Sequence, residues 1–262
     1  MNTRNNFQML SKKDLDKNDF FVLISTLKKI VGIVPSSVTS LENLIGIEEQ
    51  KKILYENTIS FIKNNDSCNI LLWGSKGMGK SSLVISNHKH LLRTYKNIKL
   101  IEILCNDLIY LPEIIYNLRK YQQKFIIFID DVNLDVNSYE FKTLKVLIQG
   151  SILSNSKNIR FYVTSNIRNI INPDSNDNFN EVQINDQRNN AIALYDRFGL
   201  ILSFYRASKE EYINLVHLYA RINKIKIDKD TEKQAIQWSI FKGDYSGRTA
   251  IQFITNLKSK IL

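Results

Sequence analysis

The chain has 262 residues, of which 44% are hydrophobic, and its 36 Lys and Arg against 26 Asp and Glu give a formal net charge of +10 at pH 7. This length is enough for one α/β domain and a small second domain. The two cysteines, Cys68 and Cys105, indicate neither a disulfide framework nor a cysteine metal cluster. The polar first residues exclude a signal peptide, and no apolar run reaches the ~18 residues of a membrane span. We therefore expect a cytoplasmic protein with no membrane partner.

The positive charge favours polyanionic partners, so nucleic acid is one candidate partner. The Asn-, Lys- and Ile-rich stretches, such as NSKNIR, can equally reflect a compositional bias of the whole proteome. The basic segment HKHLLRTYKNIK, residues 88–99, either contacts DNA or RNA or forms a solvated helix face. Charge alone leaves the partner open.

Residues 1–39 are predicted to form an N-terminal helical extension. Within them, the segment FFVLISTLKKIVGIV (20–34) spaces its apolar residues as an amphipathic helix does. The segment SLENLIGIEEQKKILYENTISFIKNN then begins at Ser40, a suitable helix cap, and predicts a long helix interrupted near Gly46.

A change of pattern follows, because apolar runs of strand length alternate with helical patterns between residues 68 and 205. The runs are CNILLW (68–73), IKLIEIL (98–104), FIIFI (125–129), IRFYVT (159–164) and LILSFY (200–205). Continuous apolar strands separated by helices predict a parallel sheet that is covered on both faces. We expect an α/β domain over residues 40–205 with a five-stranded sheet, and the polar stretch 172–190 as a mobile loop.

Three helical patterns complete the chain, around residues 207–222, 229–241 and 247–260. No strand-like run interrupts them. They predict a separate helical domain over residues 206–262.

The end of the first of these strands carries a phosphate-binding pattern. LLWGSKGMGKSS contains Gly74, four further residues, and then Gly79, Lys80 and Ser81. Glycines allow a tight turn whose N–H groups converge on phosphate oxygens, and the start of the next helix adds partial positive charge. Lys80 would neutralise the β- and γ-phosphates of ATP, and the Ser81 hydroxyl would bind Mg²⁺. The residues expected to contact the nucleotide here are Gly74, Ser75, Lys76, Gly77, Met78, Gly79, Lys80, Ser81 and Ser82.

Two carboxylates follow the strand KFIIFI, at Asp130 and Asp131. Charged groups at the carboxyl end of a buried parallel strand lie where open α/β sheets bind ligands. Asp130 would hold the Mg²⁺, and Asp131 would orient or activate the attacking water.

Four other segments resemble AAA+ ATPases and occur in the order of that family. LENLIGIEEQKK resembles the segment that lines the adenine, and IRFYVTSN ends in a polar residue similar to the first sensor near the γ-phosphate. YDRFGL resembles the segment of the arginine finger, which enters a neighbouring subunit's site, and DYSGRTAIQF resembles that of the second sensor. The matching residues are Leu44, Ile45 and Gly46 for the adenine, Asn166 and Arg248 for the sensors, and Arg197 for the finger.

Each of these polar residues also has a purely structural interpretation. Asn166 can satisfy backbone groups at a strand end, Arg197 can pair with Asp196, and Arg248 can be a solvated residue at a helix start. Their joint occurrence at compatible positions favours the functional interpretation.

Taken together, LIGIEEQK, GSKGMGKSS, FIDD, TSN, DRFGL and SGRTAIQF are similar to one bacterial AAA+ family, catalogued as a domain of unknown function (815), over about residues 40–258. The resemblance implies a P-loop AAA+ αβα sandwich with a small C-terminal helical lid, and ATP and Mg²⁺ as cofactors. Asp131 departs from the wider AAA+ pattern, which has Glu at this position. A side chain shorter by one methylene reaches less far as a base.

The expected function is Mg²⁺-dependent ATP hydrolysis coupled to a conformational change of a homo-oligomer that acts on an unknown protein or nucleoprotein partner. One alternative is a nucleotide-gated binding module with very slow turnover. Another is an ATPase of DNA replication or transposition that binds DNA, since the paired aspartates are similar to those of replication initiators.

Overall fold

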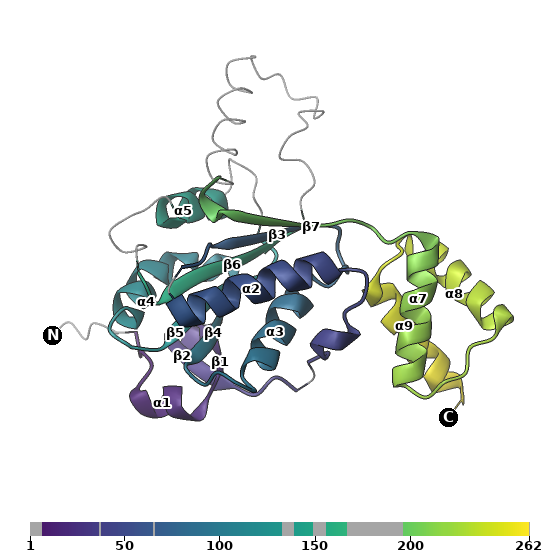
Figure 1. Cartoon of the computed structure of the whole chain (residues 1–262), viewed down its shortest axis with the longest axis horizontal. Helices are drawn as coiled ribbons and strands as arrows, with labels where there is room; N and C mark the ends of the chain where they lie inside the picture. Colours follow the sequence, from purple (N-terminus) through teal and green to yellow (C-terminus); the bar gives the residue numbers. More distant parts are fainter. Residues whose placement is uncertain are drawn as a thin grey trace, which may run out of the picture.

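The computed structural model describes residues 7–36, 38–64, 66–132, 139–148, 156–166 and 196–261. These residues form a seven-stranded sheet with the strand order β2-β1-β4-β5-β6-β3-β7, helices on its two faces, and a group of helices beside it (Figure 1). The strands are β1 (Phe20–Ile24), β2 (Lys29–Ile33), β3 (Ile70–Gly74), β4 (Ile98–Ile103), β5 (Lys124–Ile129), β6 (Ile159–Ser165) and β7 (Leu200–Phe204).

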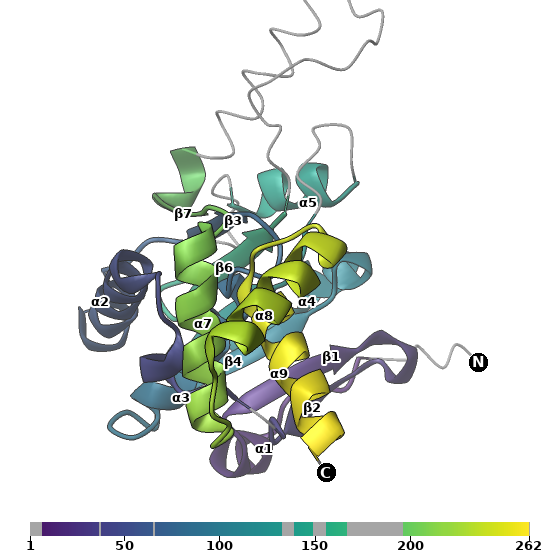
Figure 2. The same cartoon turned by 90° about the vertical axis from the view of Figure 1, so that its right-hand side faces the viewer.

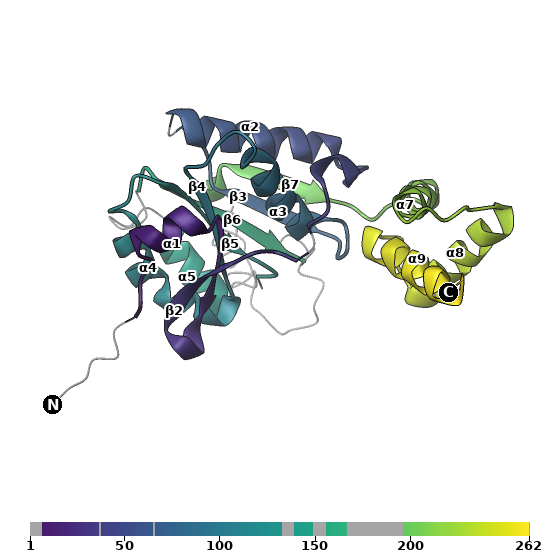
Figure 3. The ribbon, with the colours of Figure 1, turned by 90° about the horizontal axis from the view of Figure 1, so that it is seen from below.

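The helices of the α/β body are α1 (Lys12–Lys17), α2 (Glu48–Asn64), α3 (Lys80–Leu91), α4 (Leu111–Leu118) and α5 (Tyr139–Ile148), with short 3₁₀ turns η1 (Ser25–Leu27), η2 (Leu41–Asn43) and η3 (Cys105–Tyr110). Figure 3 shows α2 and α3 on one side of the sheet and α1, α4 and α5 on the other. Leu54 of α2 and Leu83 of α3 are buried in one apolar cluster, and Ile114 of α4 and Leu144 of α5 in a second. The sheet is therefore buried on both faces, as its continuous apolar strands predict.

The predicted α/β class is confirmed, and the sheet is larger than predicted. Strands β3 to β7 correspond to the five predicted apolar runs, and they pair in parallel with one another. The two additional strands come from the N-terminal segment.

The prediction of a helix over residues 20–34 is wrong, because this segment forms the antiparallel hairpin β1–β2. β1 also pairs in parallel with β4, with Phe20 opposite Leu100 and Phe21 opposite Ile101. Phe20 and Phe21 are buried on opposite faces of the sheet. The apolar residues therefore do not alternate with polar ones, and their spacing resembles that of a helix.

The lid consists of α7 (Lys209–Ile222), α8 (Lys229–Lys242) and α9 (Gly247–Ile261), which follow β7 in the chain. These helices pack around their own apolar cluster, which includes Tyr212, Val216, Ala235 and Phe253. Figure 2 views the molecule from the lid side, so α7 and α9 lie in front of the sheet. No helix in the described part of the chain has both the length and the apolar composition needed to cross a membrane.

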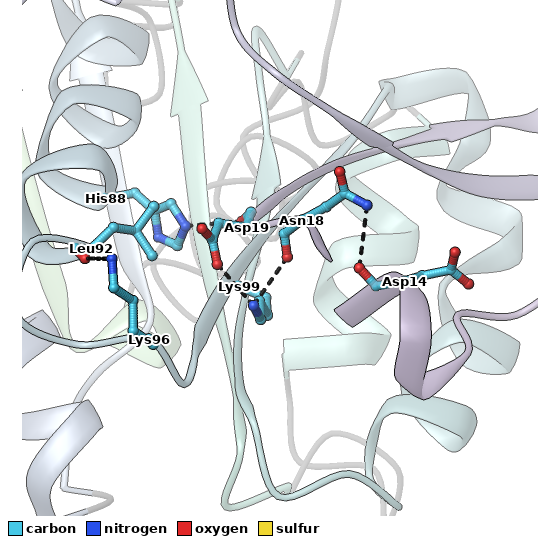
Figure 4. A network of polar contacts seen from close by, with 7 residues as sticks. All are labelled: Asp14, Asn18, Asp19, His88, Leu92, Lys96 and Lys99. Carbon is cyan, nitrogen blue, oxygen red and sulfur yellow. Dashed lines mark hydrogen bonds and ion pairs between the residues drawn. The ribbon is translucent and has the colours of Figure 1, made fainter. Parts of the chain in front are cut away.

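A buried polar cluster joins the N-terminal hairpin to α3 (Figure 4). The Nζ of Lys99, a side chain that is only 5% exposed, donates to Asp19 Oδ1 at 2.8 Å and to the Asn18 carbonyl at 3.0 Å. His88 of α3 is fully buried, and its Nε2 lies 3.0 Å from the carbonyl oxygen of Asp19. Burial lowers the pKa of His88 to about 4. The segment just before β1 is thus attached to the helix that begins at Lys80.

Candidate functional site

The predicted phosphate-binding loop connects the carboxyl end of β3 to the start of α3. Gly79 is the N-cap of α3, and its φ of 90° lies in the left-handed region that favours glycine. No side chain caps this helix. The first N–H groups of a helix lack partners within it, so the turn presents donors of the kind that bind phosphate.

Lys80 is held in place by three oxygen acceptors. Its side chain is buried, and its Nζ donates to the carbonyls of Gly74 at 2.8 Å and Ser75 at 2.9 Å and to Asn166 Oδ1 at 2.7 Å. Burial lowers the pKa of Lys80 to about 8, while the nearby charges of Asp131 and Asp130 oppose this shift. The ammonium group is therefore an incompletely compensated cation beside the loop.

The ends of β5 and β6 bring the two carboxylates into one hydrogen-bonded network with the loop. Ser81 Oγ donates to Asp130 Oδ1 at 2.5 Å, and Thr164 Oγ1 donates to the same oxygen. The backbone N–H of Asp131 donates to Thr164 Oγ1 at 2.8 Å, and Asn166 Nδ2 donates to Asp131 Oδ1. Asp131 has a φ of 55°, which is uncommon outside glycine but tolerated by aspartate. This backbone turn directs the two carboxylates to different positions.

The Ser81–Asp130 pair fits the protein's share of a magnesium site. A hydroxyl and a carboxylate oxygen lie side by side where β5 ends and α3 begins. Mg²⁺ prefers oxygen ligands and usually keeps several waters together with phosphate oxygens, so a nucleotide would supply the remaining ligands.

A cavity of about 400 Å³ lies between this network and the lid, which is within the usual size range of small-molecule sites. Its lining includes Lys80, Ser81 and the two carboxylates. It also includes apolar side chains from both the body and the lid, namely Leu44, Ile45, Ile47, Leu215 and Ile251. The cavity thus offers charged and apolar contacts to one ligand.

The lid touches the loop directly at Gly77. The backbone N–H of Arg248, in the first turn of α9, points to the Gly77 carbonyl at 3.4 Å. A Cβ added at Gly77 would lie 2.7 Å from Ser246 Oγ, so the lid could not approach this closely with any other residue there. The first turn of α9 therefore lies against the phosphate-binding loop.

Most residues predicted to bind nucleotide or metal, or to act in catalysis, line this one cavity: Leu44, Ile45, Lys76, Gly77, Met78, Gly79, Lys80, Ser81, Ser82, Asp130, Asp131, Asn166 and Arg248. Gly46 follows Ile45 with a φ of 78°. Gly74 and Ser75 contact Lys80 through their carbonyls and are not part of the lining.

Arg197 lies far from this cavity, in a short helical turn before β7, and its side chain is exposed. β7 pairs in parallel with β3, with Leu200 opposite Ile70, so Arg197 lies at the amino end of β3. The phosphate-binding loop follows the carboxyl end of this five-residue strand, about 16 Å away. The structure does not bring Arg197 into the cavity of its own chain.

Several cavity residues escaped the sequence analysis: Thr39, Ile47, Thr164, Leu215, Tyr219, Gly247, Ile251 and Gln252. Two periodicities could have found some of them. Thr164 lies two residues before Asn166, which directly follows β6, and Gln252 lies four residues after Arg248 on α9. Residues at these spacings share a face of an extended segment or of a helix.

The structure combines a mostly parallel sheet covered by helices, the predicted phosphate-binding loop between β3 and α3, and a helical lid beside that loop, which together make up the AAA+ fold. The sequence matches the family described as "Protein of unknown function (DUF815)" over residues 17–261, and the chain belongs to that family. The match begins before β1, so the N-terminal hairpin is part of the family domain. No curated protein matches the sequence.

Solved structures of similar fold include the RuvB Holliday junction branch migration motor of Thermotoga maritima, with 18% identity, a TM-score of 0.52, and coverage of 84% of this chain and 64% of that one. The Orc1 protein of Aeropyrum pernix, solved in complex with DNA, has 12% identity and a TM-score of 0.56, with coverage of 81% and 61%. A DNA replication initiation factor has 15% identity, a TM-score of 0.50, and coverage of 84% of this chain and 64% of that one. The chain therefore spans less than two thirds of each, and the likeness is one of fold.

Proposed function

We propose that this chain binds ATP and Mg²⁺ in the cavity between the sheet and the lid, and that it hydrolyses ATP within a homo-oligomer that acts on a further partner. The observation that carries this proposal is the Lys80 ammonium, buried at the cavity beside the Ser81–Asp130 pair. A cation in this setting is stabilised by an anionic ligand, and the free N–H groups of α3 favour the same end of that ligand.

Lys80 would be the counter-ion of the triphosphate. Ser81 and Asp130 would hold Mg²⁺, which would help to neutralise the phosphate charge. Arg248 lines the cavity, and its backbone contacts the phosphate-binding loop at Gly77. Its side chain would add a second positive charge at the phosphates. Asp131 would orient or activate the attacking water, with Asn166 holding its carboxylate. Arg197, at the opposite end of β3, would serve the nucleotide of a neighbouring subunit.

The binding step is tested by calorimetry with ATP and Mg²⁺ on the wild type and on Lys80→Ala. The variant loses the cation that holds the phosphates, and its affinity should fall by about 100-fold or more. Lys89→Ala is the matched control, because Lys89 lies exposed on the same helix and does not line the cavity. Equal ATP affinity in the wild type and Lys80→Ala would rule out this site.

A second candidate function is a nucleotide-gated binding module with very slow turnover. The observation in its favour is the Asn166–Asp131 hydrogen bond, which occupies one oxygen of a carboxylate that is already shorter than glutamate. Tight ATP binding with negligible turnover, alone or with candidate partners, would favour this module over the ATPase.

The partner that we propose to examine first is DNA. The net charge is +10. The three similar structures described above have names that refer to DNA: a Holliday junction motor, a complex with DNA and a DNA replication initiation factor. Binding through phosphate contacts predicts retention on DNA that weakens steeply as salt rises. Absence of retention at low salt, with and without ATP, would direct the search to protein partners.

A further inference from the structure

Two polar side chains of the lid, Tyr219 and Gln252, line the cavity without using their hydrogen-bonding groups. Within the described part of the chain, neither the Tyr219 hydroxyl nor the Gln252 side-chain amide has a hydrogen-bond partner. Burial raises the pKa of Tyr219, so its hydroxyl stays protonated and can both donate and accept. Tyr219 is partly buried and Gln252 is exposed, so both groups can exchange water for polar atoms of a ligand in the cavity.

Their positions along the lid helices order them relative to the phosphates. Arg248 contacts the phosphate-binding loop through its backbone, and Gln252 lies one turn further along α9, about 6 Å away on the same face. The Tyr219 hydroxyl lies 3.6 Å from the position of a Cβ at Gly247, next to the first turn of α9. Tyr219 is therefore nearer to the loop, and Gln252 lies further from it.

The apolar part of the cavity lining has the composition of a site for a flat ring. Leu44, Ile45 and Ile47 line it from the body, and Leu215 and Ile251 from the lid. Ile251 and Gln252 both line the cavity from α9, so the same helix supplies an apolar side chain and an amide to the ligand. The polar edge of a base bound here would face Gln252, whose side-chain amide can donate and accept at the same time.

We propose that Gln252 reads the adenine base, its amide oxygen accepting from the N6 amino group and its amide nitrogen donating to N7, while Tyr219 binds the ribose. Adenine presents a donor, the N6 amino group, beside an acceptor, N7. A glutamine amide has the acceptor and the donor that pair with these two groups. Guanine presents two acceptors on the same edge, O6 and N7, and would leave the amide oxygen facing another acceptor. Gln252 is thus the residue that favours ATP over GTP. This inference rests on the proposed function, because it assigns a role within the same nucleotide site.

The test compares ATP and GTP affinities, with Mg²⁺ present, for the full chain and for two variants. Gln252→Leu keeps the volume but removes both hydrogen bonds. Gln237→Leu makes the same change on the exposed surface of α8, outside the cavity. We expect the wild type and Gln237→Leu to prefer ATP by about tenfold or more. In Gln252→Leu, ATP affinity should fall to that of GTP, while GTP affinity hardly changes.

A modified nucleotide makes the test independent of any variant. 7-Deaza-ATP lacks the N7 acceptor, and it should bind the wild type several-fold more weakly than ATP. Tyr219→Phe should weaken ATP and GTP binding by the same factor, because the ribose is common to both.

Four results would overturn the assignment while leaving ATP binding itself intact. They are equal affinity of the wild type for ATP and GTP, an ATP preference that survives in Gln252→Leu, undiminished binding of 7-deaza-ATP, and an altered ATP-to-GTP ratio in Tyr219→Phe. Failure of every nucleoside triphosphate to bind the wild type would instead remove the proposed function, and the assignment with it.

Discussion

Lys80 has the most strongly perturbed environment among the residues that line the cavity. Burial lowers its pKa to about 8, although two carboxylates lie near enough to oppose the shift. A lysine of this kind is charged at neutral pH but begins to lose its proton in mildly alkaline solution. We therefore expect its charge state to couple the binding of an anionic ligand to pH.

ATP affinity is predicted to decrease as the pH rises above about 8. Below this pH the free protein already carries the Lys80 charge, so affinity should be level. Above it the lysine must take up a proton when the triphosphate binds, and affinity should fall towards tenfold per pH unit. Calorimetry between pH 7 and pH 9.5, in buffers of different ionisation enthalpy, measures both the affinity and the proton uptake. Lys80→Arg is the control, because arginine stays charged and its profile should be flat.

Asp131→Asn is predicted to bind ATP like the wild type and to lose hydrolysis. The amide keeps the shape of the side chain and can still bond to Asn166, but it cannot accept a proton from water. Steady-state phosphate release and ATP titration, measured on the same preparation, separate the two effects. Turnover that survives would mean that another residue activates the water.

At the scale of the helices and strands, the sequence predicts those elements whose surroundings match their local pattern. β3 to β7 are continuous apolar runs, and the lid helices have clear starts, with Ser208 and Asp228 capping α7 and α8 through their side chains. The hairpin β1–β2 is different, because its apolar residues do not alternate with polar ones and its place in the sheet depends on pairing with β4. That partner lies about 80 residues away and leaves no local signal.

The candidate site also has one part that the sequence predicts and another that it does not. The loop and Asp130 can be predicted from sequence because spacing within a strand–loop–helix unit fixes their geometry. Tyr219 and Gln252 could not, because they belong to the site through the placement of the lid, which depends on long-range packing.

The attachment of α3 to the N-terminal segment predicts a pH-dependent stability. Near pH 6.5 and below, the unfolded chain binds a proton at His88 that the folded protein, with a pKa of about 4, excludes. The free energy of unfolding should therefore fall as the pH decreases from about 6.5 to 4, by up to about 3 kcal/mol from this residue. Above pH 6.5 the contribution is constant.

Denaturant unfolding of the wild type and His88→Gln at pH 7.5 and pH 5 measures this contribution. Other groups also respond to acid, so the informative quantity is the difference between the two proteins. Between pH 7.5 and pH 5, the free energy of unfolding should fall less in His88→Gln than in the wild type. His217→Gln is the control, because His217 is partly exposed and lies beside Glu232. An identical pH response of the wild type and His88→Gln would contradict the prediction.

For the whole molecule, the position of Arg197 at the opposite end of β3 from the loop leads us to predict that hydrolysis depends on assembly. An arginine that reaches the γ-phosphate of a neighbouring subunit can contribute ~10³-fold in rate. Arg197→Ala is therefore predicted to bind ATP and to be nearly inactive. Such contacts are head to tail, so the assembly closes as a ring or continues as a filament.

Mixing Arg197→Ala with Asp131→Asn tests the contact between subunits. Each variant is inactive alone, but in a mixed assembly the second lends its Arg197 to the intact carboxylates of the first. ATPase activity should return on mixing and rise with total protein concentration. If mixed oligomers form without activity, Arg197 has a structural role, such as pairing with Asp196.

The N-terminal hairpin determines where this protein can be shortened. The sequence pattern suggested a boundary at residue 40, yet β1 covers the backbone N–H and C=O groups along one side of β4, and Phe21, Leu23 and Ile30 are buried in the main core. A chain beginning at residue 40 would expose those backbone groups as a template for strand addition between molecules. It should aggregate on size-exclusion chromatography, whereas a chain beginning at residue 7 should stay monodisperse. On this prediction, the N-terminal hairpin protects the sheet from self-association.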